Sequence, residues 1–132
     1  NTANTVMVSG GILYREQNII LSPFENDVTR NFYAKRMFMG ASGIGPLGLM
    51  EQDPLLIQAE AKLIGQAEEL IVLVDSTKFE NRSSLILCPL DRIDTIITDD
   101  RITDRTAAML DAADVSLIVV PSGAAQKEGV AS

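Results

Sequence analysis

The residues best suited to chemistry come directly after the most apolar segment of the chain. Leu70–Val74 is an uninterrupted run of apolar, mostly β-branched residues, which is the pattern of a strand covered on both faces. A carboxylate, two hydroxyls and an ammonium group follow, in Asp75, Ser76, Thr77 and Lys78. Because ligands of open α/β sheets bind at the carboxyl ends of strands, this cluster predicts a ligand-binding edge.

Lys78 is the positive charge of this cluster. It lies three residues beyond Asp75, where its ammonium group would face an anionic ligand, and Asp75 is its expected partner when the site is empty. A solvent-exposed lysine at the end of a strand is the alternative, and the sequence leaves both open.

Two other predicted strands lead into glycines. Thr5–Val8 is followed by Gly10 and Gly11, which indicate either a close approach of another group or a plain turn. Arg36–Met39 is followed by the glycine-rich segment Gly40–Gly48, which could expose backbone N–H groups to an anion or serve as a flexible linker. Its first residues, which would lie closest to a ligand, are Gly40, Ala41, Ser42 and Gly43.

Glu60 is an unexpected carboxylate on a helix that should be apolar on one side. Asp53 and Pro54 form a helix start, and Leu55–Gly65 supplies the body of the helix. At the helical period Glu60 falls inside the apolar arc, where an unpaired charge is costly. Glu60 either extends its carboxylate to the solvent or pairs structurally, or it faces a polar site.

The remaining segments alternate between strand and helix. Ser22–Glu25 predicts a helix start, with Phe24, Val28 and Phe32 on one buried stripe, and either Asp99 or Asp100 should cap the helix Ile102–Ala113. The other predicted extended segments are Ile12–Glu16, Asn18–Leu21, Leu85–Cys88, Thr95–Thr98 and Ser116–Val120. This order predicts one α/β domain with a parallel sheet and right-handed crossovers.

Composition excludes several classes of function. The chain has 132 residues, a net charge of −7 and only 11 scattered basic residues, which argues against a nucleic-acid interface. Cys88 is the single cysteine and histidine is absent, so we expect no disulfide, no zinc site and no cofactor. With no membrane segment, we expect a cytoplasmic protein. Because the sequence starts at Asn1 and enters an apolar segment at once, we expect a fragment whose missing part lies upstream.

Taken together, the sequence resembles the C-terminal effector domain of the DeoR-type bacterial transcriptional regulators. The most specific match is a strand followed by Asp-Ser-Ser/Thr-Lys-Phe, which here is Val72–Phe79. The other matching elements, at family-like spacing, are Gly10-Gly11, Phe38–Ile44, Gly48-Leu49 and Ile93–Asp99. Within the family, Ile20–Pro23 and Glu60–Lys62 are most similar to the subgroup of the L-ascorbate-utilisation repressor.

The resemblance implies a fold shared with ribose-5-phosphate isomerase, glucosamine-6-phosphate deaminase and CoA transferases, with a mostly parallel sheet and helices on both faces. It implies that residues 1–120 form a sensor domain without its N-terminal part. The Gly, Ala and Ser content of residues 121–132 separately predicts a flexible tail. Family members also carry a winged helix-turn-helix, an opening strand and an Asp-x-Gly-Ser-Thr loop upstream. DNA contact is therefore expected only through a domain outside this chain.

The function implied by the resemblance is the sensing of a phosphorylated sugar or sugar acid by a homo-oligomeric transcriptional repressor of sugar or sugar-acid catabolism, without enzymatic activity. The implied effector-binding residues are Gly10, Gly11, Gly40, Ala41, Ser42, Gly43, Glu60, Asp75, Ser76 and Lys78. Ser22, Lys35 and Ala61 depart from the family pattern, which leaves the exact ligand contacts open.

Two other classes of function use the same fold. In a sugar-phosphate isomerase, Glu60 or Asp75 would act as the general base and Lys78 would polarise an oxygen. Isomerase-like loops carry acidic residues where this chain has Ala41-Ser42, which favours a binding role. A structural oligomerisation module would explain the apolar strands but not the clustering of polar strand ends.

Overall fold

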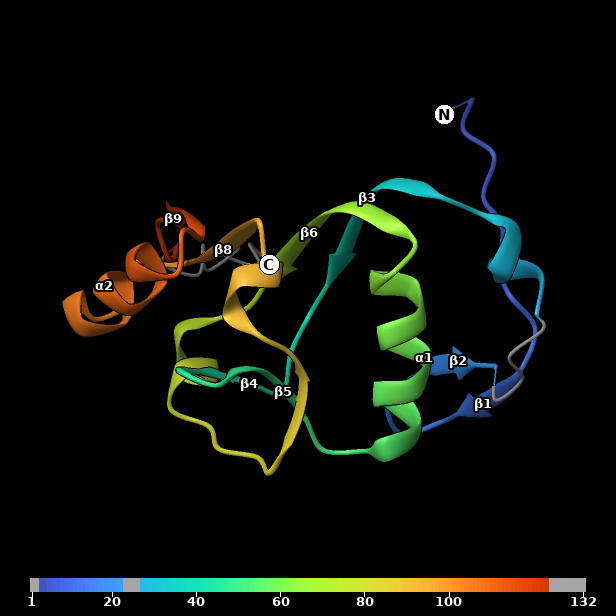
Figure 1. Cartoon of the computed structure of the whole chain (residues 1–132), viewed down its shortest axis with the longest axis horizontal. Helices are drawn as coiled ribbons and strands as arrows, with labels where there is room; N and C mark the ends of the chain where they lie inside the picture. The colour runs from blue at the N-terminus through green and yellow to red at the C-terminus, as the bar shows by residue number, and fades with distance from the viewer. Residues whose placement is uncertain (1–2, 23–26, 124–132) are drawn as a thin grey trace, which may run out of the picture.

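A four-stranded parallel sheet in the order β3-β6-β8-β9 forms the centre of the protein. The structure is a computed structural model that describes residues 3–22 and 27–123 (Figure 1). The strands of the sheet are β3 (Ala34–Met39), β6 (Ala67–Leu73), β8 (Thr95–Asp99) and β9 (Ser116–Val120). Met39 pairs with Val72, and Leu73 pairs with Ile97. The carboxyl ends of the strands therefore meet at one edge, and the predicted α/β class is confirmed.

The crossover connections carry a second, antiparallel sheet of three strands in the order β4-β5-β7. Between β3 and β6 the chain forms β4 (Gly43–Gly45), β5 (Gly48–Glu51) and helix α1 (Pro54–Ile64). Between β6 and β8 it forms the 3₁₀ turn η2 (Ser76–Phe79), β7 (Leu85–Cys88) and the 3₁₀ turn η3 (Leu90–Arg92). Helix α2 (Asp104–Ala112) joins β8 to β9.

Side chains cap the start of both α-helices. Asp53 accepts a hydrogen bond from the Leu55 N–H at 2.8 Å, and Pro54 occupies the first turn of α1 as predicted. The cap of α2 is Thr103, whose hydroxyl accepts from the Thr106 N–H at 3.2 Å. The prediction that Asp99 or Asp100 caps this helix is wrong. Neither helix of the described residues has the length and apolar content needed to cross a bilayer.

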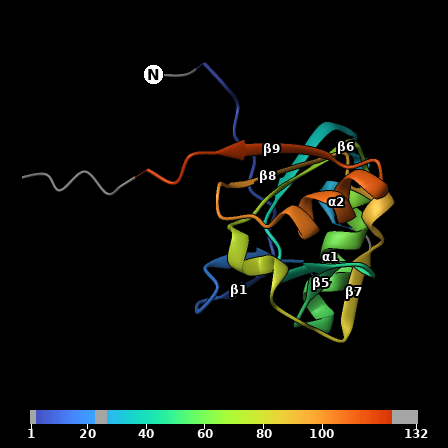
Figure 2. The same ribbon diagram turned by 90° about the vertical axis from the view of Figure 1, so that its left-hand side faces the viewer.

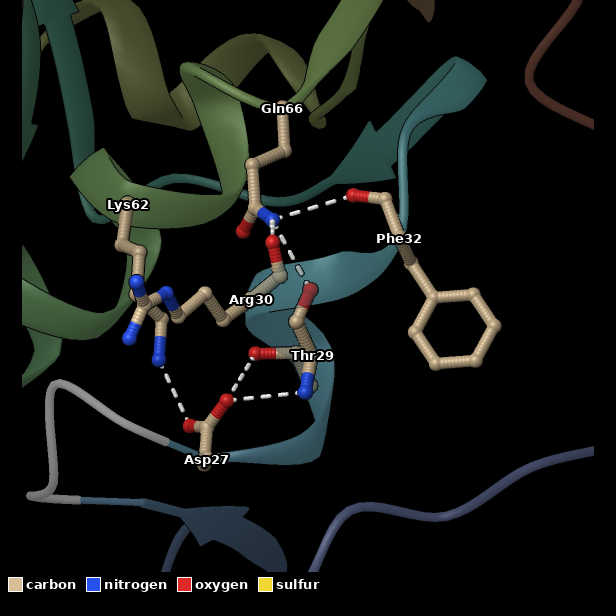
Figure 3. Close-up of polar contacts among 6 residues, drawn as sticks. All are labelled: Asp27, Thr29, Arg30, Phe32, Lys62 and Gln66. Atoms are coloured by element: carbon tan, nitrogen blue, oxygen red, sulfur yellow. Dashed lines mark hydrogen bonds and ion pairs between the residues drawn. The ribbon is translucent and has the colours of Figure 1, made fainter.

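The first part of the chain is a small hairpin beside α1, formed by β1 (Ile12–Tyr14) and β2 (Ile19–Leu21), followed by the 3₁₀ turn η1 (Val28–Asn31). Polar contacts hold η1 to α1 (Figure 3). Lys62 donates to the Asp27 carboxylate at 2.6 Å, and the Gln66 amide donates to the carbonyl oxygens of Thr29, Arg30 and Phe32. Asp27 itself caps η1 by accepting from the Thr29 N–H at 2.9 Å.

Both α-helices lie on the same face of the parallel sheet. Ile64 of α1 and Leu110 of α2 belong to one buried cluster with Leu70, Val72 and Ile96, which point to that face. The strand order explains this arrangement. Each crossover leads to the next strand on the same side of the sheet, and right-handed crossovers in one direction all place their helices on one face. We expected helices on both faces of the sheet. In the part of the chain that the structure describes, they cover one face.

The other face of the sheet is apolar and open in the described residues. Its exposed members are Phe38 (61%), Leu73 (47%), Ile118 (47%) and Val120 (44%). In β6 Leu73 alternates with buried residues, and in β3 and β9 Phe38 and Ile118 alternate with residues that are half-buried or exposed. The prediction that Leu70–Val74 is covered on both faces is thus wrong for the described part, where Leu70 and Val72 are buried and Leu73 is not.

Several local predictions also need correction. The described residues contain no strand before Ile12, so Thr5–Val8 stays unpaired and Val6 and Val8 are exposed. A strand needs a neighbour to accept its hydrogen bonds, and none is beside it. Half of the expected Gly40–Gly48 loop is the β4–β5 hairpin.

The predicted buried stripe of the first helix is also wrong. Val28 and Phe32 are 59% and 47% exposed, because this segment forms only the short turn η1. Pro23, Phe24 and Glu25 of the predicted helix start, and residues 124–132 of the predicted tail, lie outside the described residues.

The one-sided burial of β6 gives a direct test. Leu70 is fully buried and Leu73 of the same strand is 47% exposed. We expect Leu70→Ala to lower the free energy of unfolding by about 2–5 kcal/mol, because it leaves a cavity in the core. Leu73→Ala should cost less than about 1 kcal/mol. Urea unfolding at low protein concentration measures both, and equal losses would contradict the assignment of the buried face.

Candidate functional site

The structure brings the glycine-rich loop and the polar turn together at the carboxyl edge of the sheet. A Cβ atom on Gly40 would lie 3.9 Å from the Leu73 carbonyl oxygen, so the end of β3 adjoins the end of β6. The Asn81 amide donates to the Ser42 carbonyl oxygen at 3.0 Å, and η2 packs against β4. We call this region the sheet-edge site, formed by residues 40–43, Glu51, Glu60 and residues 75–78.

Close packing explains one glycine of the loop. A Cβ atom on Gly43 would lie 3.0 Å from the Asn81 carbonyl oxygen and 3.3 Å from its Cβ atom. A larger side chain would therefore push the segment after η2 away from β4. Gly43 sets how closely the two halves of the sheet-edge site approach.

Asp75 shapes the polar turn. Its carboxylate accepts from the Thr77 hydroxyl and, at 2.9 Å, from the Thr77 N–H, so it caps η2. These bonds, the hydroxyl bond first, lower the pKa of Asp75 below its ordinary value, and the charge of Lys78 contributes less. Within the described residues no ion pair joins Asp75 to Lys78. The expected pairing of these two side chains is wrong, because the carboxylate is engaged in the turn.

Asp99 links the end of β8 to the same turn. One of its oxygens accepts from the Ser76 N–H at 2.7 Å, and the other accepts from the Arg101 N–H at 3.0 Å. The bond from the Ser76 N–H holds the pKa of Asp99 well below its ordinary value, despite opposing burial. This carboxylate fixes the start of η2 on the neighbouring strand.

Glu51 is a member of the site that sequence reasoning missed. It is 6% exposed and accepts from the Ser42 hydroxyl at 2.7 Å and from the Ser42 N–H at 3.2 Å. The same N–H also approaches the Met50 carbonyl oxygen at 3.1 Å, so it is used within the protein rather than directed at an anion. The sequence signal that could have identified Glu51 is its position as a carboxylate directly after the apolar run Gly48–Met50.

Glu60 lies on α1 close enough to Glu51 for the two charges to interact, and its side chain is partly buried. Its Oε2 atom is buried and makes no hydrogen bond with the described residues. Burial, with the nearby Glu51 charge as a smaller cause, raises the pKa of Glu60 from 4.5 to about 7. Among the described residues no ion pair neutralises it, so the expected structural pairing is not seen there.

Gly10 and Gly11 do not join this group. They precede β1, and Figure 1 shows the β1–β2 hairpin on the opposite side of α1 from β4 and β5. Gly11 has a φ of +154°, and a Cβ atom there would lie 2.2 Å from the Leu21 carbonyl oxygen. Gly11 therefore serves a close backbone contact within the hairpin, whereas a Cβ atom on Gly10 would have no neighbour within 4 Å.

The sheet-edge site offers complementary chemistry. Near neutral pH the Glu60 carboxyl group can donate or accept a hydrogen bond, because its pKa is about 7. Lys78, a half-buried residue of η2, supplies a positive charge close to Asp75. Such a set suits a ligand that combines hydroxyl groups with a negative charge.

The raised pKa of Glu60 predicts how stability depends on pH. The folded protein keeps a proton that the unfolded chain loses near pH 4.5, so the stabilisation is complete below pH 4.5 and is lost as pH rises through about 7. Glu60→Gln should therefore stabilise the protein at pH 8 by about 1–2 kcal/mol, a value discounted for partial exposure, with little change at pH 5.

Urea unfolding at pH 5 and pH 8 measures this difference. The matched control is Glu68→Gln, which neutralises an exposed carboxylate on β6. An equal effect of the two substitutions at both pH values would show that Glu60 is not desolvated.

Comparison with known proteins identifies the family of this chain. Residues 1–100 match the family model described as the DeoR C-terminal sensor domain. The chain is 33% identical over 118 residues to the HTH-type transcriptional regulator UlaR of Shigella dysenteriae serotype 1, covering 89% of this chain and 46% of that protein. It is 32% identical, with the same coverage, to the protein of that name in Escherichia coli K12. The chain spans about half the length of these relatives, and it belongs to the family of DeoR-type C-terminal sensor domains.

Proposed function

We propose that this chain is the effector-binding part of a DeoR-type transcriptional repressor of sugar or sugar-acid catabolism, and that its effector is a phosphorylated sugar or sugar acid. The observation that carries this proposal is the meeting of the Gly40–Gly43 loop with the Asp75–Lys78 turn at the carboxyl edge of the parallel sheet. Ligands of open α/β sheets bind at this edge.

The polar groups of the sheet-edge site suit such an effector. Lys78 carries the positive charge that a phosphate or carboxylate group requires. Asp75 and Asp99 are both held in the ionised form, and their hydrogen bonds keep η2 in place around Lys78. Ser42 lies on the loop side, where its hydroxyl oxygen, which donates to Glu51, could accept a hydrogen bond from a hydroxyl group of a sugar.

The rest of the regulator would supply the contact with DNA. The relatives are named HTH-type transcriptional regulators and are about twice as long as this chain. We propose a longer, cytoplasmic parent protein in which residues 1–120 belong to the sensor domain and a separate helix-turn-helix domain binds the operator. The net charge of −7 agrees with a sensor that does not contact DNA itself.

A second candidate function is a sugar-phosphate isomerase-like activity, favoured by Glu60. A carboxylate whose pKa is about 7 is tuned as a general base. The buried Oε2 atom argues against this role, because a base must reach a substrate carbon. The relatives are regulators by name, which also favours binding without turnover.

Substitution of Lys78 tests the proposed effector site. We expect Lys78→Met to weaken effector binding by about 1.5–3 kcal/mol, the range for a charge-assisted hydrogen bond. The fold should persist, since no ion pair to Lys78 is lost among the described residues. Isothermal titration of the full-length protein with sugar phosphates, L-ascorbate 6-phosphate among them, measures the affinity.

The matched control is Lys35→Met, which removes an exposed lysine at the start of β3, the opposite end of that strand. Unchanged affinity of Lys78→Met for the best ligand would remove Lys78 from the site. If NMR shows that the ligand is converted to another compound in the titration cell, the proposal of a sensor is wrong and the protein is an enzyme.

We also propose that the protein is a homo-oligomer whose subunits pack through the open face of the parallel sheet. Phe38, Leu73, Ile118 and Val120 form apolar surface there. Arg36 and Glu69 on this face form an ion pair, with Nε and Oε2 3.0 Å apart, so their charges cancel. A second copy of the same face is therefore a suitable cover, and parallel sheets are normally covered on both faces.

Charge on this face should prevent the association. We expect this chain to sediment as a dimer or larger species at micromolar concentration, and the double substitution Leu73→Lys with Ile118→Lys to shift it to the monomer. The control is Leu47→Lys, which changes a more exposed leucine (73%) in the β4–β5 hairpin that lies off this face. A wild-type chain that stays monomeric across micromolar concentrations would contradict the proposal.

A further inference from the structure

Ser42 ties the start of the glycine-rich loop to two other segments. Its hydroxyl donates to one oxygen of the Glu51 carboxylate at 2.7 Å, and its N–H donates to the other oxygen at 3.2 Å. Its carbonyl oxygen accepts from the Asn81 amide at 3.0 Å. We call these contacts between Ser42, Glu51 and Asn81 the Ser42 latch. They join the loop after β3 to β5 on one side and to the segment after η2 on the other.

Glu51 is the buried anchor of the Ser42 latch. It is 6% exposed, and its place at the end of β5 is fixed by pairing with Leu85 of β7. The Ser83 hydroxyl also donates to the Glu51 carbonyl oxygen at 2.6 Å. A buried carboxylate needs hydrogen bonds to offset its lost hydration, and in the described part of the chain Ser42 supplies them. The position of the loop and the burial of this charge therefore depend on each other.

Glu60 brings a second carboxyl group close to this anchor. It lies on α1, which packs beside β5 and β7 (Figure 2). Its Oε2 atom is buried and has no hydrogen-bond partner among the described residues. Burial and, as a smaller cause, the Glu51 charge raise the pKa of Glu60 to about 7. Loss of its proton therefore places a second negative charge near a buried one, and the low dielectric of the interior strengthens their repulsion.

The elements around Glu60 carry no unpaired cation in the described part of the chain. Helix α1 packs against β2, β5, β6 and β7, and η3 adjoins its end. The titratable groups of these elements are Glu51, Glu68, Glu69, Cys88, Asp91 and Arg92. Arg92 pairs with Asp94, and Lys62 of α1 itself pairs with Asp27. Burial raises the pKa of the Cys88 thiol, so this group is uncharged near neutral pH.

We propose that Glu51 is a positioning residue for the effector loop and that ionisation of Glu60 weakens the Ser42 latch. The proposal rests on the assignment of the Gly40–Gly43 loop to the effector site. While Glu60 is neutral, the Glu51 carboxylate stays with Ser42 and holds the loop. When Glu60 releases its proton to the solvent, repulsion turns the Glu51 carboxylate away and frees Ser42. An effector that needs the held loop therefore binds with uptake of a proton at Glu60, and less tightly as pH rises.

Amide NMR of this chain without any ligand, between about pH 5 and pH 9, tests the latch. We expect the Ser42 and Gly43 amide shifts to follow the carboxyl ¹³C shift of Glu60, with a midpoint at about pH 7. Glu60→Gln should abolish this titration and keep both amides near their low-pH positions, because its side chain carries no charge. The matched control is Glu68→Gln on β6, which should leave the titration intact.

Glu51→Gln is the second variant, and it separates charge from hydrogen bonding. It keeps an acceptor for Ser42 but removes the charge, so the Ser42 amide should no longer follow Glu60, and the midpoint of Glu60 should fall. The proposal is overturned if the Ser42 amide of the wild-type chain does not titrate with Glu60. It is also overturned if Glu60→Gln leaves that titration unchanged, or if Glu68→Gln removes it equally.

Calorimetry of the full-length protein with L-ascorbate 6-phosphate tests the coupling to the effector. Titrations at neutral pH in two buffers of different ionisation enthalpy measure proton uptake, which should be larger for the wild type than for Glu60→Gln. The phosphate group titrates alike in both, so the difference reports Glu60. Equal uptake by two variants that bind would overturn the coupling. Absence of binding by both would contradict the proposed effector, while the NMR titration still decides whether the latch exists.

Discussion

The parallel pairing of β3, β6 and β8 is the constraint on which the rest of the structure depends. Strands that run in the same direction end at the same edge, so the loop after β3 and the turn after β6 must meet. The opposite edge is fixed by Asp94, which accepts from the Leu70 N–H at 2.7 Å and from Arg92 at 3.3 Å. Arg92 also donates to the carbonyl oxygens of Ile64 and Ala67, which joins the end of α1 to the start of β6.

Carboxylates do much of the local positioning. Asp27, Asp53, Asp75 and Asp99 each accept backbone N–H groups at the start of a turn or helix, which satisfies donors that would otherwise be left unpaired. Glu60 is the contrast, since its buried Oε2 atom has no partner among the described residues. The hydrogen bonds to Asp27, Asp75 and Asp99 thus favour the ionised form of these three side chains, whereas burial of Glu60 favours its protonated form.

The packing of the sheet is one-sided in the described residues. Leu70, Val72 and Ile96 are fully buried beneath α1 and α2, while the alternate residues of the same strands face away from both helices. Side chains of a strand alternate between its two faces, so a continuous apolar run indicates that both faces are apolar. The run does not indicate which element covers each face. The open face therefore marks a surface that other protein atoms are suited to cover.

The sequence by itself determined the elements whose signals are local. The caps at Asp53-Pro54, the apolar run at Leu70 and the strands around Ile96 and Ile118 were predictable, because caps and hydrophobic period act over a few residues. The Asp75–Lys78 turn and the Gly40–Gly43 loop were predictable as parts of one edge for the same reason, since parallel order follows from alternating strands and helices.

Only the tertiary structure decided the contacts between distant segments. It showed that Glu51 accepts a hydrogen bond from Ser42, that Asp99 accepts one from the Ser76 N–H and that Gly11 packs against Leu21 in the hairpin. These partners are far apart in the chain or compete with equally plausible local ones. Which of them meet is set by strand order and crossover direction, and neither leaves a signal within a short stretch of sequence.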